Sequence, residues 1–147
     1  MKIDIRKITE GEESITIRYR DPNPTVERVM AALEREQLKI WGRAEDETVS
    51  VNLSDILYLE SVDDRVFACT GDRTLRIEGT LYSFMNSVGD DSFFRCSKSM
   101  VINVNKVTGL KSLSSNRIDA TMESGEHIII SRRFASEFRR FLRGDVG

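Results

Sequence analysis

The sequence predicts a mostly β protein of the α+β class, in which a small β-β-α extension over residues 1–40 precedes a β-rich domain over residues 41–147. Short strand patterns outnumber helical ones from residue 38 onward, and polar turns separate them. Apolar residues recur at helical spacing in only a few segments. The 147 residues, 39% of them apolar, suffice for one domain of ordinary size with its own core.

Two strands and a helix are expected in the extension. Isoleucines alternate with polar residues over residues 3–8 and 15–19, and a turn at Gly11 separates the two runs. Asn23 and Pro24 begin the helix, because Asn accepts hydrogen bonds from the first free amides and Pro lacks the amide hydrogen that would stay unpaired. The apolar stripe of this helix is formed by Val26, Val29, Met30 and Leu33. We expect the stripe to pack on the extension's own sheet.

The larger domain is expected to be built mainly from short strands. They are predicted at residues 38–41, 49–53, 56–59, 66–69, 74–77, 100–104, 107–110, 118–122 and 127–130. A short helix interrupts them at Leu81, with Thr80 as its cap and Gly89 as its end. A last amphipathic helix over residues 132–143 follows Ser131, which is expected to cap it. Phenylalanines line one face of that helix and arginines cover the others.

Charge is distributed unevenly along the chain, although the net charge is only −2. Residues 91–147 hold ten Lys or Arg against six acids, a balance of +4, whereas the first ninety hold twelve against eighteen, a balance of −6. A polyanionic partner should therefore meet the C-terminal part. No signal peptide and no apolar run of membrane-spanning length is present, and only two cysteines occur, so a cytoplasmic location is expected.

The inventory of reactive side chains argues against an enzyme. His127 is the only histidine and lies in an apolar strand pattern, which favours a structural or surface role. With Cys69 and Cys96 it cannot supply the ligands of a zinc site, and both cysteines are interpreted as small strand hydrophobes. The acidic pairs 63–64 and 90–91 are interpreted as solvated turns. We expect no catalytic residue, no metal and no cofactor.

Two spaced motifs resemble those of a known family. The segment FFRCSKSMVINVNKV (93–107) and the segment GEHIIISRRFASEF (125–138) are similar to the signature of the LytTR family of bacterial DNA-binding domains. Upstream, SDILYLE (54–60) and the short helix near residues 79–88 match as well. The resemblance covers residues 38–143 and leaves the first part of the chain outside.

The resemblance implies a bacterial transcription regulator that binds double-stranded DNA. Loops of short antiparallel sheets would enter successive major grooves, without a recognition helix, on a direct repeat and as a homodimer at least on DNA. Three segments carry the contacts: residues 94–99, residues 131–133 and the turn at 61–65. The DNA-binding residues that we assign are Arg65, Arg95, Ser97, Lys98, Ser99, Ser131, Arg132, Arg133 and Arg140. Ser97 stands where the family has histidine, and Arg140 is either a phosphate neighbour or a solubilising charge.

The residue types are compatible with this assignment. Arginine presents a planar fork that fits guanine or a phosphate, and lysine supplies a point charge. Asn103, which also matches the family pattern, is interpreted as bonding the backbone of a neighbouring turn, because core-facing residues flank it.

Regulation and alternative functions remain open at this point. The extension is too short for a phosphate-receiving domain, so it is expected to dimerise or to bind a regulator, and the resemblance implies a companion membrane protein. The main alternative is a protein-interaction module without DNA binding, which uses the acidic N-terminal part. A small hydrolase is a further alternative, and it would have to depend on His127.

Overall fold

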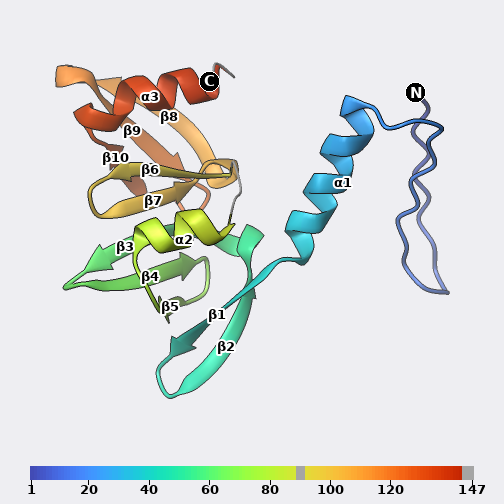
Figure 1. The fold of residues 1–147 in the computed structure, drawn as a ribbon, viewed down its shortest axis with the longest axis horizontal. Coiled ribbons are helices and arrows are strands. Elements are labelled where there is room, and N and C mark those ends of the chain that lie inside the picture. The colour runs from blue at the N-terminus through green and yellow to red at the C-terminus, as the bar shows by residue number, and fades with distance from the viewer. Residues whose placement is uncertain (89–91, 144–147) are drawn as a thin grey trace. The chain divides into compact units, whose positions relative to one another are not determined.

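The computed structural model describes residues 1–88 and 92–143 and divides into two compact units (Figure 1). The first unit is Met1–Arg35 and the second begins at Glu36. No helix within the described ranges is long and apolar enough to cross a membrane.

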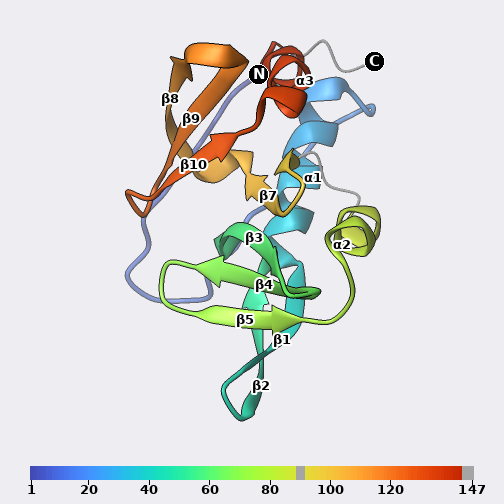
Figure 2. The ribbon, with the colours of Figure 1, turned by 90° about the vertical axis from the view of Figure 1, so that its left-hand side faces the viewer.

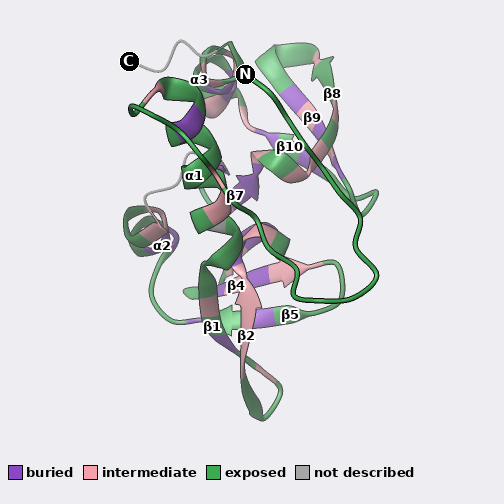
Figure 3. Ribbon diagram, turned by 90° about the vertical axis from the view of Figure 1, so that its right-hand side faces the viewer, coloured by how far each residue is buried: buried purple, intermediate pink, exposed green. Residues whose placement is uncertain are grey.

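The first unit contains a helix but no strand, which corrects the β-β part of the expected extension. Residues 1–23 form neither helix nor strand and bend at 9–11 and 20–21, and Figure 3 shows them exposed along almost their whole length. Ile3, Ile5 and Ile15 are 80%, 89% and 74% exposed. The physical reason is that an isolated pair of strands is marginal in water, and its alternating isoleucines stabilise it only when another surface covers them.

Helix α1 (Pro24–Gln37) begins as predicted. The side-chain oxygen of Asn23 accepts a hydrogen bond from the Val26 amide at 3.0 Å. Val26 is buried, whereas Val29 and Met30 are exposed. The expectation that the apolar stripe packs on a sheet of the extension is therefore wrong, because that sheet does not form.

The second unit contains two antiparallel sheets in its described part (Figure 1). The seven-stranded sheet has the order β2-β1-β5-β4-β3-β7-β6 and the three-stranded sheet has the order β10-β9-β8. The strands of the larger sheet are β1 (Lys39–Ala44), β2 (Glu47–Asn52), β3 (Ile56–Val62), β4 (Arg65–Thr70), β5 (Thr74–Ile77), β6 (Phe93–Ser97) and β7 (Met100–Asn103). The smaller sheet consists of β8 (Val107–Leu113), β9 (Arg117–Met122) and β10 (His127–Ile130). Helices α2 (Leu81–Val88) and α3 (Arg132–Leu142) complete the unit.

These elements confirm the mostly β fold class and every strand expected from residue 38 onward, but β6 was missed. The resemblance implies that residues 94–99, which include most of β6, form a DNA-contacting loop. Phe93 packs in one core cluster, whereas its neighbours Phe94 and Cys96 pack in another. A strand buried on both faces shows no alternation of apolar and polar residues, so its pattern resembles no single element.

Two hydrophobic cores share the β6–β7 end of the larger sheet as a common wall. Val101 of β7 packs with Leu59, Leu75 and Phe84 in the first core. Its neighbour Ile102 points to the opposite face and joins the second core, which α3 and the three-stranded sheet close. The two cores thus fix the β6–β7 end of the sheet and the start of α3 relative to one another.

Helix caps show one confirmed prediction and one correction. Thr80 Oγ1 accepts from the Ser83 amide at 3.0 Å, and Ser83 Oγ accepts from the Thr80 amide at 2.8 Å, so the predicted cap of α2 is present. Ser131 occupies the cap position of α3, but its side chain makes no capping hydrogen bond. Its main chain is held instead by β6, since the Ser131 amide donates to the Cys96 carbonyl. Gly89 and the acidic pair 90–91 lie outside the described residues.

Candidate nucleic-acid interface

The structure brings the three predicted segments together on the second unit. The amide of Ser61, next to the β3–β4 turn, donates to the carbonyl of Ser99 in the β6–β7 turn at 2.8 Å. The amide of Ser131, before α3, donates to the carbonyl of Cys96 in β6 at 2.8 Å. These two hydrogen bonds hold all three segments side by side. Because they join main-chain atoms, they do not depend on the side chains at these positions.

The β6–β7 turn is stabilised by its own side chains. Arg95 donates from Nε to the carbonyl of Ser97 at 3.1 Å and from Nη2 to the carbonyl of Lys98 at 2.5 Å. Ser97 Oγ accepts from the Ser99 amide at 3.3 Å. Lys98 is exposed, and its ammonium group has no hydrogen bond or ion pair with any residue in the described ranges. Lys98 is therefore the cation that this turn presents to solvent.

A hollow of about 450 Å³ separates that turn from the start of α3. Lys98 of the β6–β7 turn and Arg133 of α3 both line it, and Met85, Phe94 and Phe134 supply apolar walls. The Arg133 guanidinium lies 5.4 Å from the centre of the Phe134 ring, which restricts the directions in which it can point. The other lining residues are Arg95 and Glu137. The hollow is thus bordered by three cationic groups and one carboxylate.

Arg140 and Arg132 lie on α3 and are exposed. Arg140 follows Arg133 by seven residues, which places it two turns away on the same side of the helix, ~10 Å along the axis. Arg139 is different, since its guanidinium donates to the side-chain oxygen of Asn116 in the β8–β9 turn. Of the two neighbouring arginines, Arg140 is the one available to a ligand.

The β3–β4 turn has an unusual backbone. Asp63 and Asp64 have φ values of 51° and 63°, which are left-handed conformations that Asp tolerates better than most residues. Arg65 follows them, but it does not line the hollow near Lys98. It lines a second hollow, of about 590 Å³, with Arg43 of β1 and Arg76 of β5. Sequence reasoning missed these two arginines, because only the strand order β1-β5-β4 brings them beside Arg65.

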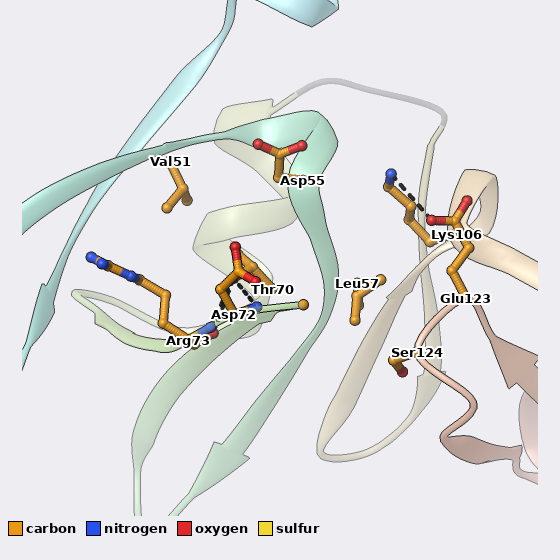
Figure 4. A pocket seen from close by; sticks show the side chains of 10 residues that line it. Val51, Asp55, Leu57, Thr70, Asp72, Arg73, Lys106, Glu123 and Ser124 are labelled. Carbon is orange, nitrogen blue, oxygen red and sulfur yellow. Dashed lines mark hydrogen bonds and ion pairs between the residues drawn. The ribbon is translucent and has the colours of Figure 1, made fainter.

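A third hollow, of about 440 Å³, contains none of the predicted residues (Figure 4). Lys106 Nζ in it lies 3.5 Å from Glu123 Oε2, and the carboxylates of Asp55 and Asp72 line the same space with Arg73. Acids outnumber bases there. This hollow is therefore unsuited to a polyanion.

Three side chains outside the proposed interface, Cys96, His127 and Asn103, have the roles that the sequence predicts. Cys96 is fully buried, and burial raises the pKa of its thiol to about 12, so it stays protonated and packs as a small hydrophobe. His127 is exposed, and its Nδ1 lies 3.0 Å from Asp119 Oδ1 on the adjacent strand. The same Nδ1 lies 3.3 Å from the hydroxyl oxygen of Thr121, and the exposed ring makes His127 a surface histidine, as predicted. Asn103 is also structural: its side-chain oxygen accepts from the Asn105 amide at 3.1 Å.

Comparison with known proteins agrees with this geometry. Residues 46–143 match the family model of the LytTr DNA-binding domain. The chain is 29% identical over 113 residues to the sensory transduction protein LytT of Bacillus anthracis, covering 77% of this chain and 46% of that protein. It is 27% identical over 94 residues to LytT of Bacillus subtilis strain 168, covering 64% and 39%. The chain thus spans less than half the length of these relatives.

A solved structure resembles the chain as well. It is a LytTr DNA-binding domain from Bacillus cereus, with a TM-score of 0.68 and 27% identity, covering 71% of this chain and 95% of that one.

Proposed function

Because the chain belongs to the LytTR family of DNA-binding domains, we propose that it regulates transcription by reading the major grooves of double-stranded DNA with three loop segments. The family is one of DNA-binding domains and not of enzymes. One observation carries the proposal: the hydrogen bonds from Ser61 to Ser99 and from Ser131 to Cys96 hold the three segments together. The cations Lys98 and Arg133 then border one hollow between two of them.

The residues differ in the roles that we propose. Arg133 reads base edges, because a guanidinium fork matches the O6 and N7 acceptors of guanine in the major groove. Lys98 neutralises a phosphate, as a point charge on a flexible stem does. Arg95 positions the β6–β7 turn that carries Lys98, since two of its N–H groups already bond that turn's carbonyls. Arg132 and Arg140 lie beside phosphates.

The serines and Arg65 complete the proposed interface. Ser97, Ser99 and Ser131 lie where the three segments meet, and each offers a small hydroxyl that can approach the sugar-phosphate backbone closely. Arg65 extends the interface beyond the β3–β4 turn.

The assembly on DNA follows from the same proposal. We expect two copies on a direct repeat, with residues 1–40 as the unit that pairs the copies or binds a regulator, such as a companion membrane protein. The exposed isoleucines at positions 3, 5 and 15 support this role, because apolar side chains in an alternating pattern gain free energy when a partner covers them. The same observation favours a second candidate function, a protein-interaction module that does not bind DNA.

Selection of bound duplexes from a random pool, using the full chain, tests the proposal. We expect enrichment of one sequence, and we expect its affinity to fall steeply as salt increases, because cationic side chains release counterions from the phosphates. If the folded chain enriches no sequence and its weak DNA binding does not depend on salt, the interaction module is the correct alternative.

A further inference from the structure

Three arginines form a row across the exposed face of the larger sheet. In antiparallel register, Arg43 of β1 lies directly opposite Arg76 of β5. Arg76 lies in turn opposite Phe67 of β4, whose side chain shares a face with Arg65 two residues earlier. All three arginines are exposed, and they line one hollow (Figure 2 shows β4 and β5 side by side). We call these three residues the arginine row.

The close approach of β1 to β5 depends on Gly42. A Cβ atom at this position would lie 2.8 Å from Ile77 Cδ1 and 2.9 Å from the carbonyl oxygen of Arg76. Gly42 is buried between these neighbours, so the next residue, Arg43, must point to the opposite, exposed face. The glycine therefore determines that Arg43 and Arg76 stand side by side.

The positive charges of the arginine row have no ion-pair partner in the described part of the chain. Like charges directly opposite each other on neighbouring strands are destabilising. Asp64 and Glu78 line the same hollow, yet none of the three guanidinium groups makes a hydrogen bond or ion pair with a residue in the described part of the chain. Three free guanidinium groups offer many donors and no acceptor, which is the chemistry that binds anionic oxygens.

We infer that the arginine row binds the sugar-phosphate backbone of DNA next to the bases read by the β6–β7 turn and α3. This inference rests on the proposed function. Continuity identifies the occupant: Arg65 ends the β3–β4 turn, and Ser61 at the start of that turn is bonded to Ser99 beside Lys98. Neighbouring strands are about 4.8 Å apart, so the row is ~10 Å wide and matches about three nucleotide steps of 3.4 Å.

Trp41 offers a reporter on the same face. It is the only tryptophan of the chain, it precedes Arg43 by two residues on β1, and it is 65% exposed. Residues two apart on a strand share a face. DNA that covers the arginine row should therefore change the fluorescence of Trp41.

The test compares the double variant Arg43→Ala/Arg76→Ala with the parent and with Lys111→Ala, which removes an exposed cation from the other sheet. Two duplexes are used: the selected sequence alone, and the same sequence with about one helical turn, ~10 base pairs, added on each side. On the longer duplex we expect the double variant to reduce the magnitude of the log K against log salt slope by about two. The double variant should lose the same factor in affinity for selected and for random sequences, relative to the parent. On the shorter duplex, parent and variant should bind alike, and only the longer duplex should quench Trp41.

Several outcomes would overturn the inference. If Lys98→Ala weakens binding but the double variant keeps the parent's salt slope on the longer duplex, the arginine row does not touch DNA, and the proposed function stands. If the double variant binds DNA normally but loses binding to polyglutamate, the row serves an acidic protein instead. If the parent binds no DNA, the proposed function fails together with the inference. Arg43→Gln/Arg76→Gln removes the charges but keeps the β, γ and δ carbons of both side chains, so it must reproduce the Ala result, which excludes a loss caused by altered packing of these carbons.

Discussion

The side-chain amide of Asn103 donates a hydrogen bond to the main-chain carbonyl of Ile56 at 2.8 Å, although 47 residues separate the two in the sequence. Both residues are buried. The contact ties the end of β7 to the start of β3, the two strands on which the β3–β4 and β6–β7 turns are mounted. A buried hydrogen bond far from solvent thereby helps to align the proposed DNA-binding segments.

Replacing Asn103 should destabilise the fold, because its buried side-chain amide bonds both the Ile56 carbonyl and the Asn105 amide. Asn103→Leu leaves the buried carbonyl of Ile56 without its partner, which typically costs about 1–3 kcal/mol. Urea unfolding followed by circular dichroism measures the loss, with Asn86→Leu on the exposed side of α2 as the control. Equal stability of the two variants would contradict the structural role of Asn103.

The Gly42 contact predicts a large effect from one methyl group. Gly42→Ala places a Cβ against backbone and side-chain atoms of β5, so β1 must move, at a cost of about 1–3 kcal/mol. Gly71→Ala is the matched control, because nothing lies within 4 Å of a Cβ there. We expect a lower Tm for Gly42→Ala only. A Gly42→Ala protein as stable as the control would show that β1 and β5 are not in close contact.

The sequence patterns predicted the elements that are buried on one face. They failed for a strand that is buried on both faces and for apolar runs that no other surface covers. Strands such as Thr74–Ile77 alternate buried and exposed residues and were found directly. β6 was not, because Phe93 and Phe94 belong to different cores. Residues 3–8 and 15–19 alternate as strands do, yet no strand forms there, because alternation supplies an apolar face but not the surface that covers it.

Some residues of the candidate site could be predicted from the sequence and others could not. The family motifs located Lys98 and Arg133, which are neighbours in the fold because each motif spans one of the meeting segments. Arg43 and Arg76 carry no local signal. Their juxtaposition depends on a strand order in which β1 pairs with β5, and no periodicity along the chain specifies that order.

The buried thiol of Cys96 predicts a pH dependence of stability. Burial raises its pKa from the ordinary 9.0 to about 12, so the folded state binds this proton more tightly than the unfolded state does. The contribution of this proton to the free energy of unfolding is fully present below pH 9. It is lost as the pH rises from about 9 to about 12, by up to ~1.4 kcal/mol per pH unit.

Urea unfolding across this pH range measures the effect in the parent and in Cys96→Ala. The variant starts less stable, because it lacks the sulfur in a packed core, but its stability should fall less steeply above pH 9. Burial also raises the pKa of Tyr58, so part of the parent's slope should remain in the variant. Identical slopes would mean that the thiol is not buried in solution.

Truncation to residues 38–147 should preserve DNA binding but weaken it. The fragment keeps every strand of both sheets and the carbonyl of Leu38, which accepts from the Leu53 amide at 2.9 Å. It loses residues 1–37, most of the unit for which we propose pairing or regulator binding, so the affinity for a direct repeat should drop more than the affinity for a single half-site. Gel-shift titrations on both duplexes measure this. A folded fragment that binds neither duplex would place essential contacts in the first unit.

Single substitutions should separate base reading from charge. Arg133→Ala removes a proposed bidentate contact, so it should cost about 1–3 kcal/mol on the selected duplex and much less on random DNA. Lys98→Ala removes a phosphate contact, so it should weaken both equally and reduce the magnitude of the salt slope by about one. Ser97→His restores the residue of the family pattern in the β6–β7 turn and should strengthen binding or change the base preference if that turn faces DNA. Fluorescence anisotropy at several salt concentrations resolves these effects. Folded Arg133→Ala and Lys98→Ala proteins that both bind the selected duplex as tightly as the parent would refute the proposed interface, because the hollow between the β6–β7 turn and α3 would then carry no contact.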